Sequence, residues 1–132
     1  MIFIDTNIPM YLVGTDHPNK ATAQRLTERS VALGDRLVTD AEVLQEIIHR
    51  YSAIDRLAAI EDAFNVLMNL ADEVFPIEST DVQRARRLVV GPGRMSARDA
   101  LHAAIMQRYD VAEIMTFDRG FDGLPGIRRL SD

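Results

Sequence analysis

Short apolar runs alternate with helical apolar stripes along this chain. The run at 1–4, Met-Ile-Phe-Ile, is continuously apolar, which is typical of a strand covered on both faces. Further short strands are expected at 37–38, 74–77, 113–117 and 127–130. Helices are expected at 8–13, 20–33 and 55–71, and after Thr39, Thr80 and Ser96. This alternation predicts an α/β fold with a central, mainly parallel sheet of four to five short strands flanked by helices.

Three of the predicted helix starts resemble capping boxes. In this motif a Ser or Thr begins the helix and an acid or Gln follows three residues later. Thr39 is followed by Glu42 in this way, and Ser96 by Asp99; Thr80 has a Gln at the equivalent place. These acids therefore have a structural explanation, whether or not they also belong to a functional site.

Length and composition predict one globular domain, 1–132, with a single core. The chain has 132 residues, of which 47% are hydrophobic, and it has no Cys. Disulfides, thiolate metal sites and Cys nucleophiles are thereby excluded, and a cytoplasmic location is expected. The chain shows neither a signal segment nor an apolar run near twenty residues, so no membrane association is expected.

The charge distribution is uneven. The net charge of −5 argues against a protein that holds nucleic acid mainly by bulk electrostatics. The C-terminal part is nevertheless rich in arginine. Its candidates for an exposed basic surface are Arg84, Arg86, Arg87, Arg94, Arg98, Arg119, Arg128 and Arg129. Most of these are expected on solvated helix faces and loops.

Two predicted strands lead to a carboxylate. Asp5 follows the first strand and Asp118 follows the strand at 113–117, so in a parallel sheet both acids lie at one edge. Asp99 and Glu46 lie in the first two turns of helices that start from the same edge. At about 5 Å and an effective dielectric near 20, each like-charged pair costs roughly 3 kcal/mol. Such a cluster needs a cation or raised pKa values, and all-oxygen ligands favour Mg²⁺ or Mn²⁺.

Each of these acids also has a structural alternative. Asp5 is able to cap the helix that follows it, and Asp99 would stabilise a helix start by about 0.3–1 kcal/mol. Glu46, away from the apolar stripe, has the pattern of a solvated helix residue, and Asp122 is either a turn residue or an outer ligand. His102 is expected to pack within its helix.

Four segments together resemble the PIN-domain family and, within it, the VapC-like toxin ribonucleases of type II toxin–antitoxin systems. They are IFIDTN at the start, EVLQEIIHR in the middle, and SARDALHAAIMQR and IMTFDRGFDGLPGIRRL in the last third. The resemblance runs over essentially the whole chain in order and spacing.

The resemblance implies a three-layer fold and a Mg²⁺-dependent endoribonuclease held inactive by a VapB-like antitoxin. It also suggests a homodimer. The family acids fall on Asp5, Glu46, Asp99 and Asp118, with Asp122 as a further candidate ligand. Glu42 remains an alternative to Glu46, because the two lie one helical turn apart and the family expects one glutamate.

The mechanism expected from this resemblance is hydrolysis of RNA by a metal-activated water. Mg²⁺ or Mn²⁺ would be held by the four acids, and the substrate would be a structured RNA with a short exposed target, since few aromatic residues offer a stacking platform. The residues expected to position the substrate are Thr6, Asn7, Ser96, Arg98, Thr116 and Arg119.

Three other classes were weighed against this one. A receiver-like module needs a lysine near its last strand, but the only lysine is Lys20. A haloacid-dehalogenase phosphatase needs Asp-x-Asp after the first strand, where this chain reads Asp-Thr-Asn. A catalytically inactive PIN-like protein-binding or regulatory module remains the alternative, and the presence of all four acids argues against it.

Overall fold

The centre of the molecule is a five-stranded parallel sheet. The computed structural model describes residues 1–131. The strands are β1 (Ile2–Ile4), β2 (Leu37–Asp40), β3 (Glu73–Phe75), β4 (Glu113–Met115) and β5 (Arg128–Arg129). Their order across the sheet is β3-β2-β1-β4-β5, and every neighbouring pair is parallel. The expected α/β architecture with a parallel sheet is confirmed, and the Pro-containing segment after β3 follows an edge strand, as its sequence indicated.

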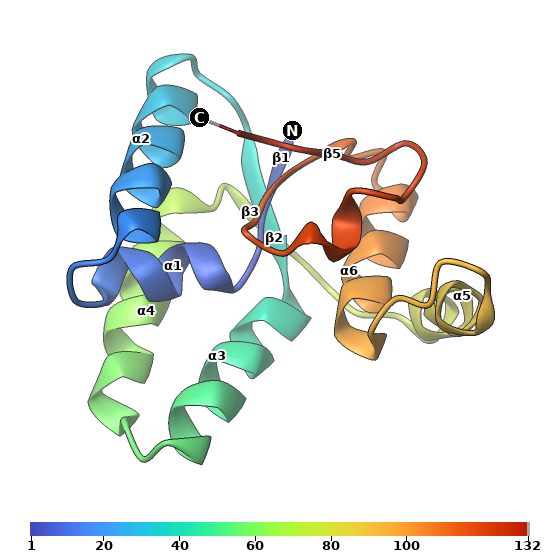
Figure 1. Ribbon diagram of the computed structural model, residues 1–132, viewed down its shortest axis with the longest axis horizontal. Helices are drawn as coiled ribbons and strands as arrows, with labels where there is room; N and C mark the ends of the chain where they lie inside the picture. The colour runs from blue at the N-terminus through green and yellow to red at the C-terminus, as the bar shows by residue number, and fades with distance from the viewer. Residues whose placement is uncertain (132) are drawn as a thin grey trace.

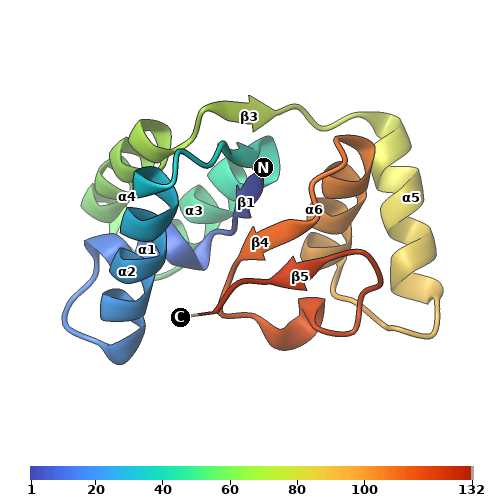
Figure 2. The same cartoon turned by 90° about the horizontal axis from the view of Figure 1, so that it is seen from above.

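Helices cover both faces of this sheet. They are α1 (Asn7–Val13), α2 (Pro18–Ala32), α3 (Ala41–Ala53), α4 (Leu57–Leu70), α5 (Ser79–Val90) and α6 (Ala97–Arg108), with a short 3₁₀ turn, η1 (Arg119–Phe121). In both ribbon views α1, α2 and α4 lie on one side of the sheet, and α5 and α6 lie on the other (Figures 1 and 2). The molecule therefore has three layers.

The central strand β1 is apolar because both of its faces are covered. Phe3 is fully buried and lies in register with Val38 of β2 and Ile114 of β4. Burying a side chain of this size contributes roughly 1.5–3 kcal/mol. Helix α6 is likewise buried on more than one side, as its sequence predicted, since Ala103 and Ile105 are both fully buried. The core thus fixes the carboxyl end of β1 and the first turn of α6 relative to each other.

The start of α3 differs from the prediction. Thr39 is not an N-cap but a buried residue of β2, and its hydroxyl donates a hydrogen bond to the Ile4 carbonyl at 2.9 Å. The N-cap is Asp40, whose carboxylate accepts from the Val43 N–H at 2.9 Å. The strand runs two residues further than its apolar residues suggest because β2 pairs with β3 up to Asp40. The predicted capping box of Thr39 and Glu42 is therefore wrong.

The start of α5 also lies elsewhere than predicted. Its N-cap is Glu78, and the Asp81 carboxylate accepts from the Glu78 N–H at 2.8 Å. Thr80 is inside the helix, so the predicted box at Thr80 is wrong. Asp81 is held in place by Arg108 of α6, which donates to both of its carboxylate oxygens. At α6 the predicted N-cap is confirmed, since the Ser96 hydroxyl accepts from the Asp99 N–H at 3.2 Å.

Within residues 1–131, none of the helices is both long and apolar enough to span a lipid bilayer.

Candidate active site

Asp5 lies directly after β1 and is nearly buried. Its Oδ2 accepts from the Thr116 hydroxyl at 2.6 Å, and its Oδ1 accepts from the Thr6 N–H at 2.7 Å. Burial raises the pKa of Asp5 above its ordinary value, although the charge of His102 and these two hydrogen bonds act in the opposite direction. The structure thus holds this carboxylate in one orientation at the edge of the sheet.

Thr116 joins both strand ends at this edge. Strand β4 ends at Met115, one residue before it, and not at 117 as predicted. Besides donating to Asp5, the Thr116 hydroxyl accepts from the Asp118 N–H at 3.0 Å and from the Asn7 side-chain amide at 3.1 Å. The Asn7 carbonyl oxygen in turn accepts from the Phe117 N–H at 3.3 Å. Thr116 and Asn7 therefore hold the loop that carries Asp118, which is a positioning role.

Asp99 and Asp118 face each other across the backbone of Gly120. Asp118 accepts from the Gly120 N–H at 2.8 Å. A β-carbon on Gly120 would lie 3.1 Å from an oxygen of each carboxylate, so a larger residue would crowd the pair. Burial, followed by the hydrogen bond and charge of Asp118, raises the pKa of Asp99 to about 7. The two acids therefore repel each other within one site.

Glu46 is nearly buried in the second turn of α3 and points toward bases. Its Oε1 lies 3.6 Å from Nε2 of His102, and its Oε2 lies 3.6 Å from Arg98 and 3.8 Å from Arg50. Burial alone would raise the pKa of Glu46, but His102 and Arg98 outweigh burial and lower it. Glu46 is therefore the α3 glutamate that lies within 4 Å of basic side chains at this site.

Two residues of the cluster were not anticipated as such, Asp40 and His102. His102 is fully buried, and its Nδ1 lies 2.7 Å from Oδ2 of Asp40. Its Nε2 lies 3.8 Å from Asp5 and 3.6 Å from Glu46. Burial would lower the pKa of His102, but the charge and the hydrogen bond of Asp40, followed by the nearby carboxylates of Glu46 and Asp5, raise it well above its ordinary value. Within residues 1–131, its Nε2 is buried and has no hydrogen-bond partner. The imidazole thus lies among three carboxylates that favour its protonated form.

Signals for both residues exist in the sequence. His102 packs in its helix, as predicted, but it also lies three residues after Asp99, on the same side of α6. Asp40 ends β2 as Asp5 follows β1, and these strands are parallel neighbours. The apolar pattern places the end of this strand at Val38, so Asp40 is not recognised from the sequence as an acid at a strand end.

The remaining predicted residues lie around the cluster. Both oxygens of Asp122 accept from Arg129, at 2.7 and 3.0 Å, and this bond lowers the pKa of Asp122. Its carboxylate is thus engaged by a half-buried arginine, which does not favour the predicted role as an outer metal ligand. Arg98 and Arg119 are exposed, and Ser96 caps α6.

The donors of the cluster fit a hard divalent cation. Within the described part of the chain, no three acidic or histidine side chains lie close enough to hold one ion as they stand. The candidate donors are carboxylate oxygens, as Mg²⁺ and Mn²⁺ prefer. A bound cation would offset the unfavourable burial of the Asp99 charge and its repulsion with Asp118, which together raise the pKa of Asp99. In the same part of the chain, the buried Thr6 hydroxyl has no hydrogen-bond partner. Asp5, Glu46, Asp99 and Asp118 are the residues that would hold such an ion.

Comparisons with known proteins agree with this architecture. The model of the PIN domain family matches residues 2–127. Ribonuclease VapC13 of Mycobacterium tuberculosis is 57% identical over 131 residues, which cover 99% of this chain and 100% of that protein. The crystal structure of M. tuberculosis VapC20, described as a Sarcin-Ricin loop cleaving toxin, has a TM-score of 0.73 at 24% identity, and the match covers 97% of this chain and 99% of that chain. VapBC2 from Rickettsia felis, bound to a DNA fragment from its promoter, has a TM-score of 0.74 at 17% identity, with 98% of both chains covered. The chain belongs to the PIN domain family.

Proposed function

We propose that this protein is a metal-dependent endoribonuclease, the VapC-type toxin of a type II toxin–antitoxin pair. The observation that carries the proposal is the meeting of Asp5, Glu46, Asp99 and Asp118 at the carboxyl edge of one parallel sheet. The 57% identity with a protein named as a ribonuclease, over nearly the whole of both chains, supports the same activity.

The carboxylates serve this reaction by holding a divalent ion. Bound Mg²⁺ or Mn²⁺ would lower the pKa of a water molecule and stabilise the charge that develops on the scissile phosphate. Hydrogen bonds from the Thr116 hydroxyl and the Thr6 N–H fix the orientation of the Asp5 carboxylate, and the Gly120 N–H does the same for Asp118. His102 lies between Asp40, Asp5 and Glu46, and its protonated form would offset part of the repulsion among these three carboxylates.

The exposed arginines have a complementary role. Arg98 and Arg50 both reach Glu46, and their side chains are each 48% exposed. Arg119 is exposed one residue after Asp118. Guanidinium groups in these places would bind the phosphates that flank the cleaved bond, which fixes the position of RNA without reading its sequence.

The substrate that we propose is a structured RNA with an exposed loop, and the partner is a VapB-like antitoxin. VapC20, which has the same fold, is described as a Sarcin-Ricin loop cleaving toxin, and VapBC2 is bound to a DNA fragment from its promoter. We further propose a homodimer that acts in the cytoplasm. The antitoxin would inhibit cleavage when added to the purified toxin.

A cleavage assay tests this function. Purified protein is incubated with a labelled RNA hairpin and with double-stranded DNA, in Mg²⁺, in Mn²⁺ and in EDTA. We expect cleavage of the RNA only with metal, no cleavage of the DNA, and a loss of at least about a hundredfold in Asp5→Asn and Asp118→Asn. Asp62→Asn, an exposed acid of α4, is the matched control and should cut normally.

Two results would contradict the proposal. Cleavage in EDTA at the rate seen with Mg²⁺ would exclude a metal-dependent mechanism. A wild-type protein that cuts no RNA in either metal, but still binds a partner protein, would favour the catalytically inactive PIN-like binding or regulatory module.

A further inference from the structure

A pocket opens directly beside Asp118 and is not used by the carboxylate cluster. It has a volume of about 510 Å³ and is bounded by α1, the loop at 14–17, the end of α3 and the loop at 117–118. This volume lies within the range of pockets that bind small ligands, about 300–1,000 Å³. Asp118 contributes to its wall, so an occupant of the pocket would lie next to the reacting phosphate.

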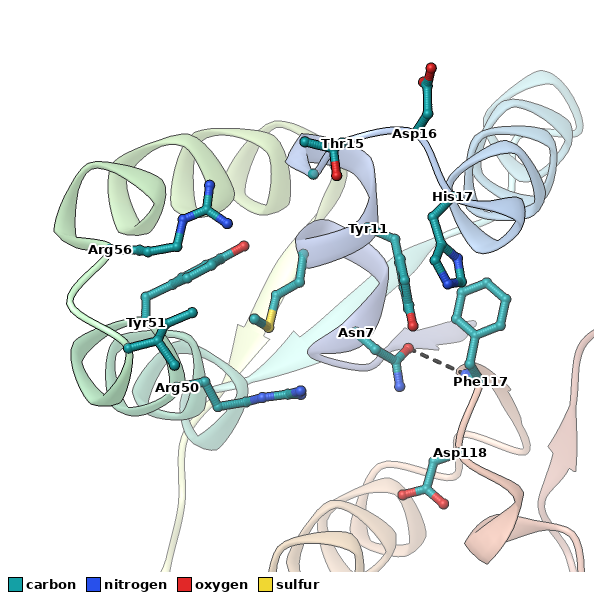
Figure 3. A pocket seen from close by; sticks show the side chains of 13 residues that line it. Asn7, Tyr11, Thr15, Asp16, His17, Arg50, Tyr51, Arg56, Phe117 and Asp118 are labelled. Atoms are coloured by element: carbon teal, nitrogen blue, oxygen red, sulfur yellow. Dashed lines mark hydrogen bonds between the residues drawn. The ribbon is translucent and has the colours of Figure 1, made fainter.

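Three aromatic rings line one side of this pocket. Tyr11 of α1 lies at the centre, with ring-centroid distances of 5.0 Å to His17 and 5.1 Å to Phe117. Figure 3 shows the three side chains side by side at the edge of the pocket, with Asp118 below Phe117. Tyr11 and Phe117 are half-buried and His17 is exposed, so their surfaces are partly accessible. Aromatic faces of this kind stack on nucleobases whatever the base.

The other side of the pocket carries positive charge. Arg50 and Arg56 come from the end of α3 and the turn after it, and both are exposed. In Figure 3 they lie across the pocket from the three rings. Rings on one side and guanidinium groups on the other match the two parts of a nucleotide, an apolar base and an anionic phosphate.

We propose that this pocket, which we call the Tyr11 pocket, binds one unpaired nucleotide of the RNA substrate next to the scissile phosphate. The base stacks on Tyr11 and Phe117, and Arg50 and Arg56 bind the adjoining phosphate. The proposal rests on the ribonuclease function proposed above and adds to it a subsite for one nucleotide. It also explains how a chain with few aromatic residues binds single-stranded RNA, because one stacked base needs only this small group of rings.

A protein segment is the competing occupant, since Ile54 and Met10 also line the pocket. The nucleotide is favoured because the pocket is continuous with Asp118 and because two cations face the rings. An apolar segment seated there would take the exposed Arg56 out of water without bringing it an anionic partner, which costs desolvation free energy. The test below distinguishes the two occupants.

The test measures RNA binding and cleavage in parallel. A fluorescein-labelled RNA hairpin with a single-stranded loop is bound to the Asp5→Asn background by fluorescence anisotropy in Mg²⁺, and the same hairpin is cut by the otherwise wild-type enzyme. Tyr11→Leu keeps the apolar volume but removes the ring, and we expect it to weaken binding by about 5- to 150-fold. Tyr11→Phe keeps the ring, and it should stay within about twofold of wild type.

Arg56→Ala provides a second variant, independent of the packing of α1. It should weaken binding and reduce the dependence of binding on salt, because one phosphate contact is lost. Arg36→Ala is the matched control. Arg36 pairs with Glu73 just before β2, at the opposite edge of the sheet from Asp118, so this change should leave both measurements unaltered.

The results separate the subsite from the function. If Tyr11→Leu and Arg56→Ala bind and cut the hairpin as wild type does, the subsite is refuted while the ribonuclease function stands. If both variants retain RNA binding but lose affinity for the co-expressed antitoxin, the pocket belongs to a protein partner and the proposal is overturned. If the wild-type enzyme cuts no RNA at all, the proposed function itself fails. A raised KM with little change in kcat for Tyr11→Leu would support the subsite.

Discussion

Replacing Asp99 by Asn should make the metal-free protein more stable while it abolishes the proposed ribonuclease activity. The side chain keeps its size, and Asn cannot be ionised. Burial and the neighbouring Asp118 raise the pKa of Asp99 from 3.8 to about 7, which means that its charge destabilises the folded state. Removing the charge therefore removes a cost that the native protein carries in order to bind metal.

The magnitude follows from the pKa of Asp99. A shift of about three units corresponds to about 4 kcal/mol at 1.36 kcal/mol per unit, as an upper bound. Asp99 is only partly buried, so solvent screening reduces this figure to about 2 kcal/mol. Losing the acid from the first turn of α6 offsets about 0.3–1 kcal/mol of that gain. The net increase in the free energy of unfolding is about 1–2 kcal/mol, or about 4–8 °C in melting temperature.

The pH dependence of this difference has a definite sign. Below pH 3.8 Asp99 is protonated in both the folded and the unfolded chain, so wild type and Asp99→Asn should be equally stable apart from the capping change. Between pH 4 and about 7 only the unfolded wild type ionises at this residue, and wild type becomes progressively less stable than the variant. Above about pH 7 the difference should be constant.

Urea unfolding in EDTA at pH 4, 5.5, 7 and 8.5 measures this difference, with Asp62→Asn as the exposed control. Mg²⁺ at a hundredfold excess over its dissociation constant should then add about 2.7 kcal/mol to the stability of wild type and much less to that of Asp99→Asn. An Asp99→Asn protein that is less stable than wild type at pH 8.5 in EDTA would refute the reasoning. So would equal stabilisation of both proteins by metal.

Three further predictions test the surroundings of the site. Glu46→Gln should abolish RNA cleavage and Glu42→Gln should retain most of it, because Glu46 is the glutamate within 4 Å of the buried His102 imidazole. If a gel assay shows Glu42→Gln to be the inactive variant, the metal site must be reassigned by one helical turn. Thr116→Val should lower the free energy of unfolding by about 1–3 kcal/mol and impair cleavage, since it removes the side-chain donor to the buried Asp5 carboxylate. Thr116→Ser should restore both, and equal effects of Val and Ser would show that the hydroxyl is irrelevant. Arg108→Met should lower the free energy of unfolding, measured with urea, by about 2–3 kcal/mol, because it leaves the buried Asp81 carboxylate without its arginine partner. Cleavage by the remaining folded protein should not change, and adding Asp81→Leu should recover part of the lost stability. An Arg108→Met protein as stable as wild type would show that the pair contributes nothing.

The capping boxes show where the sequence was a poor guide. Thr39 has the pattern of an N-cap, yet it lies in β2 because pairing with β3 continues to Asp40. Strand pairing between residues more than thirty positions apart thus overrides a local signal that is worth about 1 kcal/mol. At Ser96, where no strand competes, the local signal and the structure agree.

The sequence by itself determined the α/β class and the edge of the sheet where the acids meet. The alternation of strand-like and helix-like apolar patterns predicts a parallel sheet, and the carboxyl ends of parallel strands always share one edge of the sheet. Asp5 and Asp118 were predicted in this way, and the four motifs added the PIN-domain family.

Only the tertiary structure decided the distances within that edge. It brought His102 to Asp40 across 62 positions of sequence, made Thr116 the donor to Asp5, and engaged Asp122 with Arg129. It also assembled the Tyr11 pocket from segments that are remote in the chain. The physical reason is that such contacts are set by how helices and strands pack on one core, and that packing depends on all the residues together rather than on any local pattern.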